Sequence, residues 1–168
     1  MRRKDREITD LTAIEAILRR ARVLHLGLVD GNAPYVVPMH YGYTLRGGVL
    51  TFYLHSAQEG RKLDVIRANP NAFVEIDADE ALISGGETAC RYGASFSSVM
   101  GSGRAVIVED AAEKVRALDI LMRTQTARSF PITEEMASTV AVIRVDVDAF
   151  TAKRRPLPPE RQKAETPD

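Results

Sequence analysis

The chain has 168 residues, of which 45% are hydrophobic and 27% are charged, the balance typical of a soluble globular protein with one domain. Lysine and arginine number 23, and so do aspartate and glutamate. The formal net charge is therefore zero, and a nucleic-acid partner is not expected. The one cysteine, Cys90, excludes an intramolecular disulfide and every zinc motif built from several cysteines.

The longest apolar run, residues 23–29, contains His25 and Gly27 and is far too short to cross a bilayer. The first residues carry several charges, and no apolar stretch typical of a signal sequence follows them. We therefore expect a cytoplasmic protein with no membrane partner.

Hydrophobic periodicity predicts about three helices and six or seven strands. In the first helix, Leu11, Ile14 and Ile17 recur at helical spacing, and Asp10 can cap the first turn. The expected helices cover residues 10–21 and 59–68 and a segment that opens at 110–113; the expected strands cover residues 22–29, 34–44, 49–55, 72–77, 96–108 and 140–149. Because the strands and helices do not alternate, we expect a mainly β fold, a small antiparallel barrel, rather than a parallel doubly wound sheet.

Two features refine this picture. Gly101 and Gly103 inside the strand 96–108 predict a bulge or a sharp bend, as the corner of a small barrel needs. From Lys153 onward the chain has four prolines, many charges and almost no large apolar residues. We therefore expect a flexible N-terminus over residues 1–9, one domain over residues 10–152 and a disordered tail over residues 153–168.

Residues 55–62, which read His-Ser-Ala-Gln-Glu-Gly-Arg-Lys, join a strand to a helix and favour an anion site. Ser56 and Glu59 have the spacing of a capping box. Arg61 and Lys62 fall in the first helical turn, where the helix dipole makes each cation unfavourable by roughly 0.3–1 kcal/mol. A bound anion makes cations favourable at these positions, since the anion contacts helix N–H groups, the Ser56 hydroxyl and both cations. The alternative is that both cations are ordinary solvated residues.

Pro38 lies inside the strand predicted over residues 34–44. Proline cannot donate to a ladder, so this strand should lie at an edge or be bulged there. Backbone groups beside Pro38 then become available to a planar, amide-like heterocycle, and His40, Tyr41 and Tyr43 supply polar aromatic edges. The alternative is that tyrosine and valine simply suit a β-strand.

Three segments together resemble the pyridoxamine 5′-phosphate oxidase-like flavoproteins, and within them most closely the nitroimidazole-reductase-like (NimA-like) branch. They are residues 34–43, residues 55–62 with Asn69-Pro70, and residues 97–103, and they occur in this order within residues 10–152. The second segment is the most specific. The resemblance implies a split β-barrel of Greek-key topology that binds FMN as a homodimer, with the flavin at the subunit interface.

The resemblance also implies which residues surround the flavin. Backbone contacts to the isoalloxazine ring are implied for Val36, Val37 and Met39. Ser98 and Val99 would approach the ring from the long strand. The residues implied around the ribityl phosphate are His55, Ser56, Arg61 and Lys62, with Lys62 the strongest candidate for the ion pair.

Two departures from the family pattern bear on function. The long strand often opens with Tyr-Arg-Ser-Val in this branch, whereas here it reads Phe-Ser-Ser-Val at residues 96–99, which puts one cofactor or dimer contact in doubt. The oxidase proper also has a C-terminal segment with arginine and tryptophan for pyridoxal phosphate. This chain has no tryptophan, so a role in vitamin B6 synthesis is disfavoured.

The three histidines, His25, His40 and His55, show no helical metal spacing, and we expect no protein-ligated metal. Haem is an alternative cofactor, because one histidine suffices as its axial ligand. We assign His40 a substrate-side role near the flavin. The alternative is a strand histidine that hydrogen-bonds to a neighbour.

The leading hypothesis is an FMN-dependent oxidoreductase, a reductase or oxidase that acts on a small oxidised substrate, for example a nitroaromatic such as a nitroimidazole. The cofactor would carry the redox chemistry while the protein positions and tunes it. One alternative is a non-catalytic flavin- or haem-binding module. Another is a reductase that uses the deazaflavin F420 on the same barrel.

Overall fold

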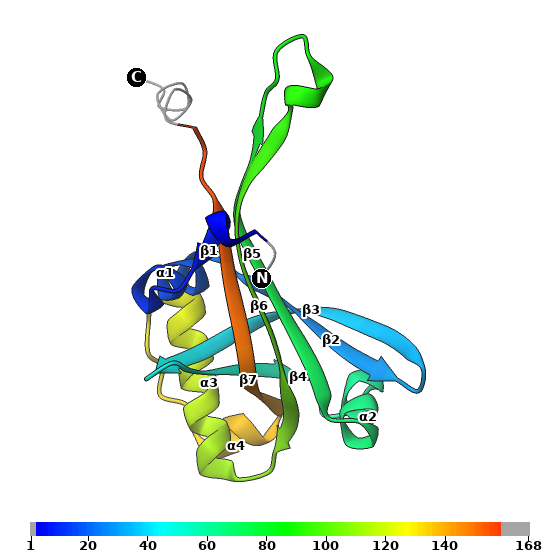
Figure 1. The fold of residues 1–168 in the computed structure, drawn as a ribbon. Helices are drawn as coiled ribbons and strands as arrows, with labels where there is room; N and C mark the ends of the chain where they lie inside the picture. Colours follow the sequence, from blue (N-terminus) through cyan, green and yellow to red (C-terminus); the bar gives the residue numbers. More distant parts are fainter. Residues whose placement is uncertain (1–2, 159–168) are drawn as a thin grey trace.

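The computed structural model describes residues 3–158 and is built mainly of strands (Figure 1). The strands are β1 (Glu7–Ile8), β2 (Val23–Asp30), β3 (Ala33–Arg46), β4 (Val49–Ser56), β5 (Asn71–Ile83), β6 (Gly93–Val108) and β7 (Ala141–Arg155). The helices are α1 (Leu11–Arg20), α2 (Arg61–Ala68), α3 (Ala111–Thr126) and α4 (Glu134–Ser138), with short 3-10 turns η1 (Lys4–Arg6) and η2 (Ala89–Arg91). None of the helices in this part of the chain has the length and apolarity that crossing a membrane requires.

The strands close into a split barrel, as the sequence predicts. Their order is β1-β7-β4-β3-β2-β5-β6, and an additional β6–β7 pairing closes the ring. Every pair is antiparallel. The register of β6 against β7 shifts between Ser102 and Gly103, which confirms the expected bulge. A Cβ at Gly103 would lie 2.1 Å from the carbonyl oxygen of Asp146, so only glycine fits this crossing of the two strands.

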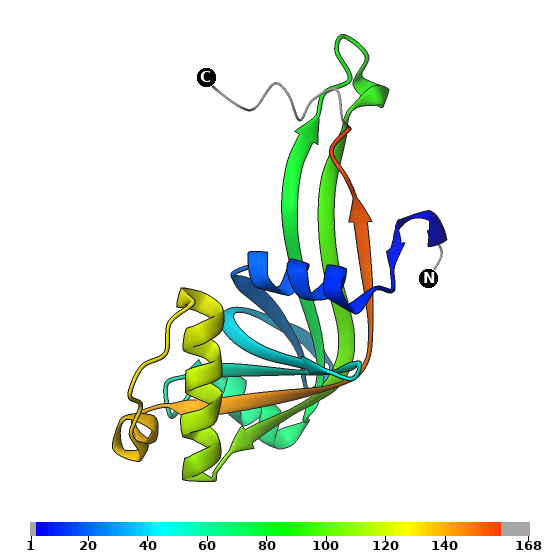
Figure 2. The ribbon, with the colours of Figure 1, turned by 90° about the vertical axis from the view of Figure 1, so that its left-hand side faces the viewer.

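The hairpin of β5 and β6 is longer than expected and, with the end of β7, extends away from the barrel (Figures 1 and 2). The sequence predicted a strand over residues 72–77 only and left 81–89 unassigned. The alternation of core-facing and solvent-facing residues breaks because β5 has a bulge between Ala78 and Ala81, where Asp79 takes a φ of 64°. The strand resumes after this bulge and ends at Ile83.

Three further expectations need correction. Strand β7 runs to Arg155 and pairs with β6 throughout, so residues 153–155, expected in the tail, belong to the sheet. Residues Glu7–Ile8 pair with β7 rather than lying outside the fold. The short helix α4, capped by the Thr133 hydroxyl, was not predicted. Residues 156–158 follow β7 without regular secondary structure, and residues 159–168 of the expected tail lie outside the described residues.

The core fills the barrel and the space beneath α1. Helix α1 buries Ile14, Ile17 and Leu18, the apolar stripe seen in the sequence. Tyr41 is fully buried, packs edge-on against Phe52 at 5.5 Å between ring centroids, and donates its hydroxyl to the Leu18 carbonyl at 2.8 Å. This bond satisfies a polar atom that would otherwise be costly to bury, and it links β3 to α1.

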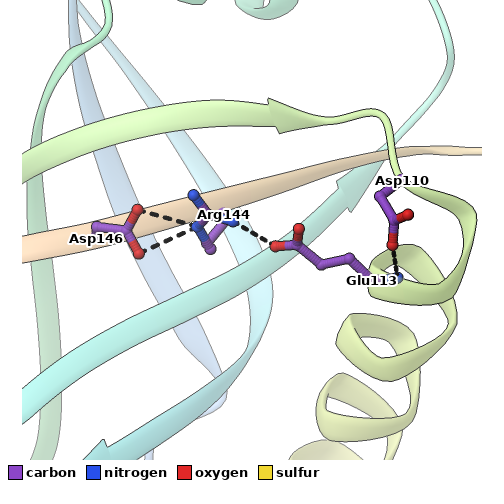
Figure 3. A network of polar contacts seen from close by, with 4 residues as sticks. All are labelled: Asp110, Glu113, Arg144 and Asp146. Carbon is purple, nitrogen blue, oxygen red and sulfur yellow. Dashed lines mark hydrogen bonds and ion pairs between the residues drawn. The ribbon is translucent and has the colours of Figure 1, made fainter.

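An ion network fixes the start of α3 against β7 (Figure 3). The Arg144 guanidinium on β7 bonds the Asp146 carboxylate at 2.9 Å and also Glu113 in the first turn of α3. The Asp110 carboxylate accepts the Glu113 backbone N–H at 2.7 Å and so caps the helix. The helix therefore lies in one orientation across the strands, where it covers one side of the barrel.

Helix α3 meets β3 most closely at Gly42. A Cβ placed there would lie 2.5 Å from the Cα and N of Leu121, which are backbone atoms and cannot move aside alone. We expect Gly42→Ala to lower the free energy of unfolding by about 1–3 kcal/mol, measured by urea titration. Gly27→Ala is the control, because its Cβ would approach the Phe73 carbonyl only to 3.3 Å. Equal losses in the two variants would contradict this account of the packing.

Candidate functional site

Half of strand β3 has an open edge. Residues 33–40 pair with β2 on one side, but pairing with β4 on the other side begins only at Tyr41. The barrel is split at this point. The prediction that Pro38 marks an edge is therefore confirmed.

The backbone groups that face this edge follow from the register. Asp30 and Ala33 close a two-residue turn in which Gly31 has a φ of 61°, the form of a type II′ hairpin. Since hydrogen-bonded pairs alternate along an antiparallel ladder, the odd-numbered residues from 33 to 39 bond to β2. The even-numbered residues face the open edge. Both prolines of β3, Pro34 and Pro38, are even-numbered, so they cost no ladder bond.

Val36 is consequently the one residue between Pro34 and Pro38 that presents both an N–H and a C=O to the edge. Its side chain is 59% exposed on the outer face of the sheet. The backbone groups of Val37 and Met39 point towards β2 instead. Any contact that these two residues make at the edge must come through their side chains.

Helix α2 begins beside this edge. Its N-cap is Gly60, with a φ of 138° and no side-chain cap. The expected capping box of Ser56 and Glu59 is therefore wrong, and the Ser56 hydroxyl donates to the adjacent Ala57 carbonyl at 2.9 Å. Helix-start N–H groups without a side-chain cap remain available to an external acceptor.

The Lys62 ammonium, from the first turn of α2, lies next to the side chain of Met39 in β3. Its Nζ is 4.0 Å from the Sδ of Met39, a residue that is 7% exposed. Partial burial lowers the pKa of Lys62 below its usual value. No described carboxylate pairs with this ammonium, so Lys62 is a half-buried cation that an anion would stabilise.

The Arg61 side chain contacts the hairpin of β2 and β3. Its guanidinium binds the Asp30 carboxylate at 2.8 Å and lies over the Tyr35 ring at 4.6 Å from the centroid. This arrangement fixes α2 against the β2–β3 hairpin. The sequence grouped Arg61 with Lys62 and did not anticipate either partner, although Asp30 beside the turn was a carboxylate within reach.

The two histidines predicted at the site lie together. His40 Nδ1 donates to the Arg22 carbonyl at 3.0 Å. Desolvation first, then the neighbouring His40 and Lys62, lower the pKa of His55 from its usual 6.5. His40, His55 and the Lys62 cation therefore form one group at the end of the open edge.

Ser98 and Val99 are not part of this group within one chain. Their strand, β6, is paired on both sides at this point, to Ile76 and Asp77 of β5 and to β7. The Val99 side chain is 1% exposed and belongs to the main core. The half-buried Ser98 shares its strand face with Met100, on the outside of the sheet.

The cavity with the residues Glu15, Tyr43 and Gln125 in its lining lies away from this group. It has a volume of about 650 Å³ and is lined by residues of α1, β3 and α3. Two of its arginines are engaged, Arg19 with Glu15 and Arg123 with Asp119. The candidate site is thus an open surface along β3 rather than an enclosed pocket.

Comparisons with known proteins agree with this architecture. The family model described as pyridoxamine 5′-phosphate oxidase matches residues 10–154. A candidate 5-nitroimidazole antibiotic resistance protein from Bacteroides thetaiotaomicron is 34% identical, with a TM-score of 0.74 over 88% of this chain and 86% of that one. No curated protein matches the chain.

Two more distant structures share the fold. The flavocytochrome Anf3 from Azotobacter vinelandii is 23% identical, with a TM-score of 0.73 over 98% of this chain and 78% of that one. The FAD and heme binding protein from Mycobacterium smegmatis is 16% identical, with a TM-score of 0.73 over 96% of this chain and 80% of that one. The extent of the family match and the identity to the Bacteroides protein together show that this chain belongs to the pyridoxamine 5′-phosphate oxidase family.

Proposed function

We propose that the chain binds FMN along the open edge of β3. The observation that carries this proposal is the juxtaposition of one free backbone N–H and C=O pair, at Val36, with a half-buried cation, Lys62, that no described carboxylate neutralises. A flavin ring offers a complementary amide-like edge, and its phosphate is a dianion that suits Lys62, His55 and the start of α2. The residues therefore fit the cofactor that the family resemblance implies.

The second half of the site comes from another copy of the chain in this proposal. Ser98 lies apart from Lys62 within one chain, so it reaches the flavin only across a homodimer interface, whereas the Val99 side chain is buried in the core and makes no such contact. The outer face of the sheet supports such an interface, because Val36, Phe73 and Met100 are 59%, 45% and 36% exposed there. Light scattering should give twice the 18.5 kDa of one chain. A monomer with full flavin affinity would exclude the interface.

The proposed activity is that of an oxidoreductase for a small oxidised substrate, a nitroimidazole being the test case. The description of the 34% identical Bacteroides protein supports this substrate class. Bound flavin supplies the electron and hydride chemistry. The chain holds the phosphate at Lys62, fixes the ring edge at Val36, and keeps the His40 imidazole oriented through the Arg22 carbonyl, on the substrate side of the ring.

The cofactor is tested by the absorbance spectrum of the purified protein and by chromatography of what heat releases. Two visible flavin bands and released FMN support the proposal. The activity is tested by reducing the flavoprotein anaerobically and adding metronidazole. Return of the oxidised flavin bands together with loss of the nitro absorbance supports a nitroreductase. A protein that holds flavin but never turns over supports a binding module, and a Soret band supports a haem module built on His40 or His55.

Flavin affinity should depend on pH through His55. Its lowered pKa means that the imidazole is neutral at pH 7 in the free protein. A bound phosphate stabilises the imidazolium and raises that pKa, so binding takes up a proton. We expect FMN affinity to rise as the pH falls from about 8 towards 6.5, the unperturbed His pKa, measured by fluorescence titration. Riboflavin, which lacks the phosphate, and His55→Gln should both lack this rise; an identical rise in either contradicts the role of His55.

A further inference from the structure

A second group of chemically active side chains lies on the outer face of the sheet, the face that also carries Phe73 and Met100. His25 of β2 and Glu75 of β5 are direct partners in the β2–β5 register, and Asp77 lies two residues further along the same face of β5. His25 Nδ1 is 2.8 Å from Glu75 Oε2 and 3.9 Å from Asp77 Oδ1. One ligand atom from each residue lies within 4.8 Å of the others.

These spacings are close to those in the coordination shell of a small divalent ion. Zinc binds imidazole nitrogen and carboxylate oxygen at about 2.0–2.2 Å, so neighbouring ligand atoms are about 3.0–3.5 Å apart. The two distances from His25 Nδ1 bracket this range. Strand β2 lies between β3 and β5, and β5 lies between β2 and β6, so the backbones that carry the three ligands are fixed from both sides.

The charges of the group are not balanced by protein cations. Within residues 3–158, neither Glu75 nor Asp77 pairs with a lysine or an arginine, and His25 is the one basic partner of both. The nearby Arg20 is bound to Asp79 instead. A simple cross-strand histidine–glutamate pair would leave the Asp77 carboxylate 3.9 Å from His25 with no lysine or arginine partner among the described residues.

We propose that His25, Glu75 and Asp77 form a binding site for one divalent transition-metal ion. The ion takes the place of the Nδ1 proton of His25, and the remaining positions are filled by water. One imidazole with carboxylates suits Zn²⁺, Mn²⁺ or Fe²⁺, whereas Ca²⁺ and Mg²⁺ prefer oxygen ligands alone. The site joins β2 to β5. It revises the expectation of no protein-ligated metal, since that expectation considered helical spacing and not ligands brought together across strands.

Zinc titration of the full-length protein tests this site. The protein is first stripped with a chelator, and ZnCl₂ is then added in a phosphate-free buffer while heat is recorded by calorimetry. We expect one zinc ion per chain. His25→Ala should weaken zinc binding by on the order of 100-fold, because loss of even an outer partner of a metal ligand costs up to that much. Glu87→Gln, an exposed carboxylate near the hairpin tip, is the control and should bind as the parent does.

The competing zinc site is the pair His40 and His55, so His55→Ala is tested in parallel. Zinc binding that survives His55→Ala but not His25→Ala supports the proposal. Absence of binding in the parent protein, or loss in His55→Ala alone, overturns it. Glu75→Gln keeps the size of the side chain and replaces His25→Ala as the deciding variant if the latter does not fold.

X-ray absorption at the zinc edge adds a readout that affinity alone does not give. The proposed site predicts one imidazole and otherwise oxygen ligands at about 2.0–2.2 Å. Two imidazoles would place the ion at His40 and His55 and would overturn the assignment. Glu75 and Asp77 pair with Met100 and Ser98 in the β5–β6 register, so this site lies on the face proposed as the homodimer interface. The titration is therefore made on cofactor-free protein, and its failure leaves the proposal for the β3 edge untouched.

Discussion

Lys62→Met is expected to weaken FMN binding by about 1–3 kcal/mol, or roughly 5- to 150-fold, the scale of a charge-assisted hydrogen bond. Methionine keeps the length and the apolar stem of the side chain, which packs near Met39, and removes only the ammonium. The stability of the fold should therefore change little. Affinity is measured by quenching of flavin fluorescence on titration into cofactor-free protein.

Arg61→Gln is the matched control for Lys62→Met. Both residues lie in the first turn of α2, but the Arg61 guanidinium is bound to Asp30 and covers the Tyr35 ring. Its removal should cost less FMN affinity than the loss of Lys62. An equal or greater cost would mean that Arg61 leaves Asp30 to bind the phosphate, and the assignment of the ion pair to Lys62 would be wrong. Riboflavin should bind the parent and Lys62→Met equally.

Val36→Pro is expected to weaken FMN binding by about 0.5–1.5 kcal/mol, or roughly 2- to 13-fold, because it removes the N–H that faces the open edge. The fold should tolerate it, since Pro34 and Pro38 already occupy equivalent positions along this edge. Circular dichroism and the melting temperature check the fold, and flavin titration checks the affinity. Val36→Thr keeps the N–H and a β-branched side chain and should bind FMN nearly as the parent does.

Val37→Pro tests which residues of β3 bond to β2 and which face the open edge. Residue 37 pairs with Leu26 of β2, and its N–H faces that strand, so proline here removes a ladder bond. We expect a lower melting temperature from this variant and not from Val36→Pro. The opposite result would mean that the alternation along β3 is reversed, and that Val37 rather than Val36 faces the flavin.

The barrel and most of its strands could be predicted because their side chains alternate between core and solvent. The length of β5 could not, since the bulge at Asp79 breaks the alternation, and only the pairing with β6 shows that the strand resumes. Similarly, the charged residues Lys153 and Arg155 look like tail residues. They form the end of β7 because β6 lies beside them along its whole length.

The residue types of the candidate site could be predicted from the sequence, but the contacts that these residues make with one another could not. The cation in the first turn of α2 and the proline in β3 are local signals, and the edge that the proline predicts is observed. Which of Arg61 and Lys62 faces an anion depends on Asp30 and Tyr35, residues about 30 positions away in sequence. Likewise, His25 acquires its carboxylate partners only through the β2–β5 register, which no local pattern reveals.

The account depends most on where the flavin lies. A crystal structure of the protein with FMN tests this directly. We expect the ring edge within hydrogen-bond distance of the Val36 backbone, the phosphate within hydrogen-bond distance of Lys62 Nζ, and Ser98 of a second copy beside the ring. A flavin bound elsewhere, or a phosphate held by Arg61 with Lys62 pointing away, would contradict the proposed site.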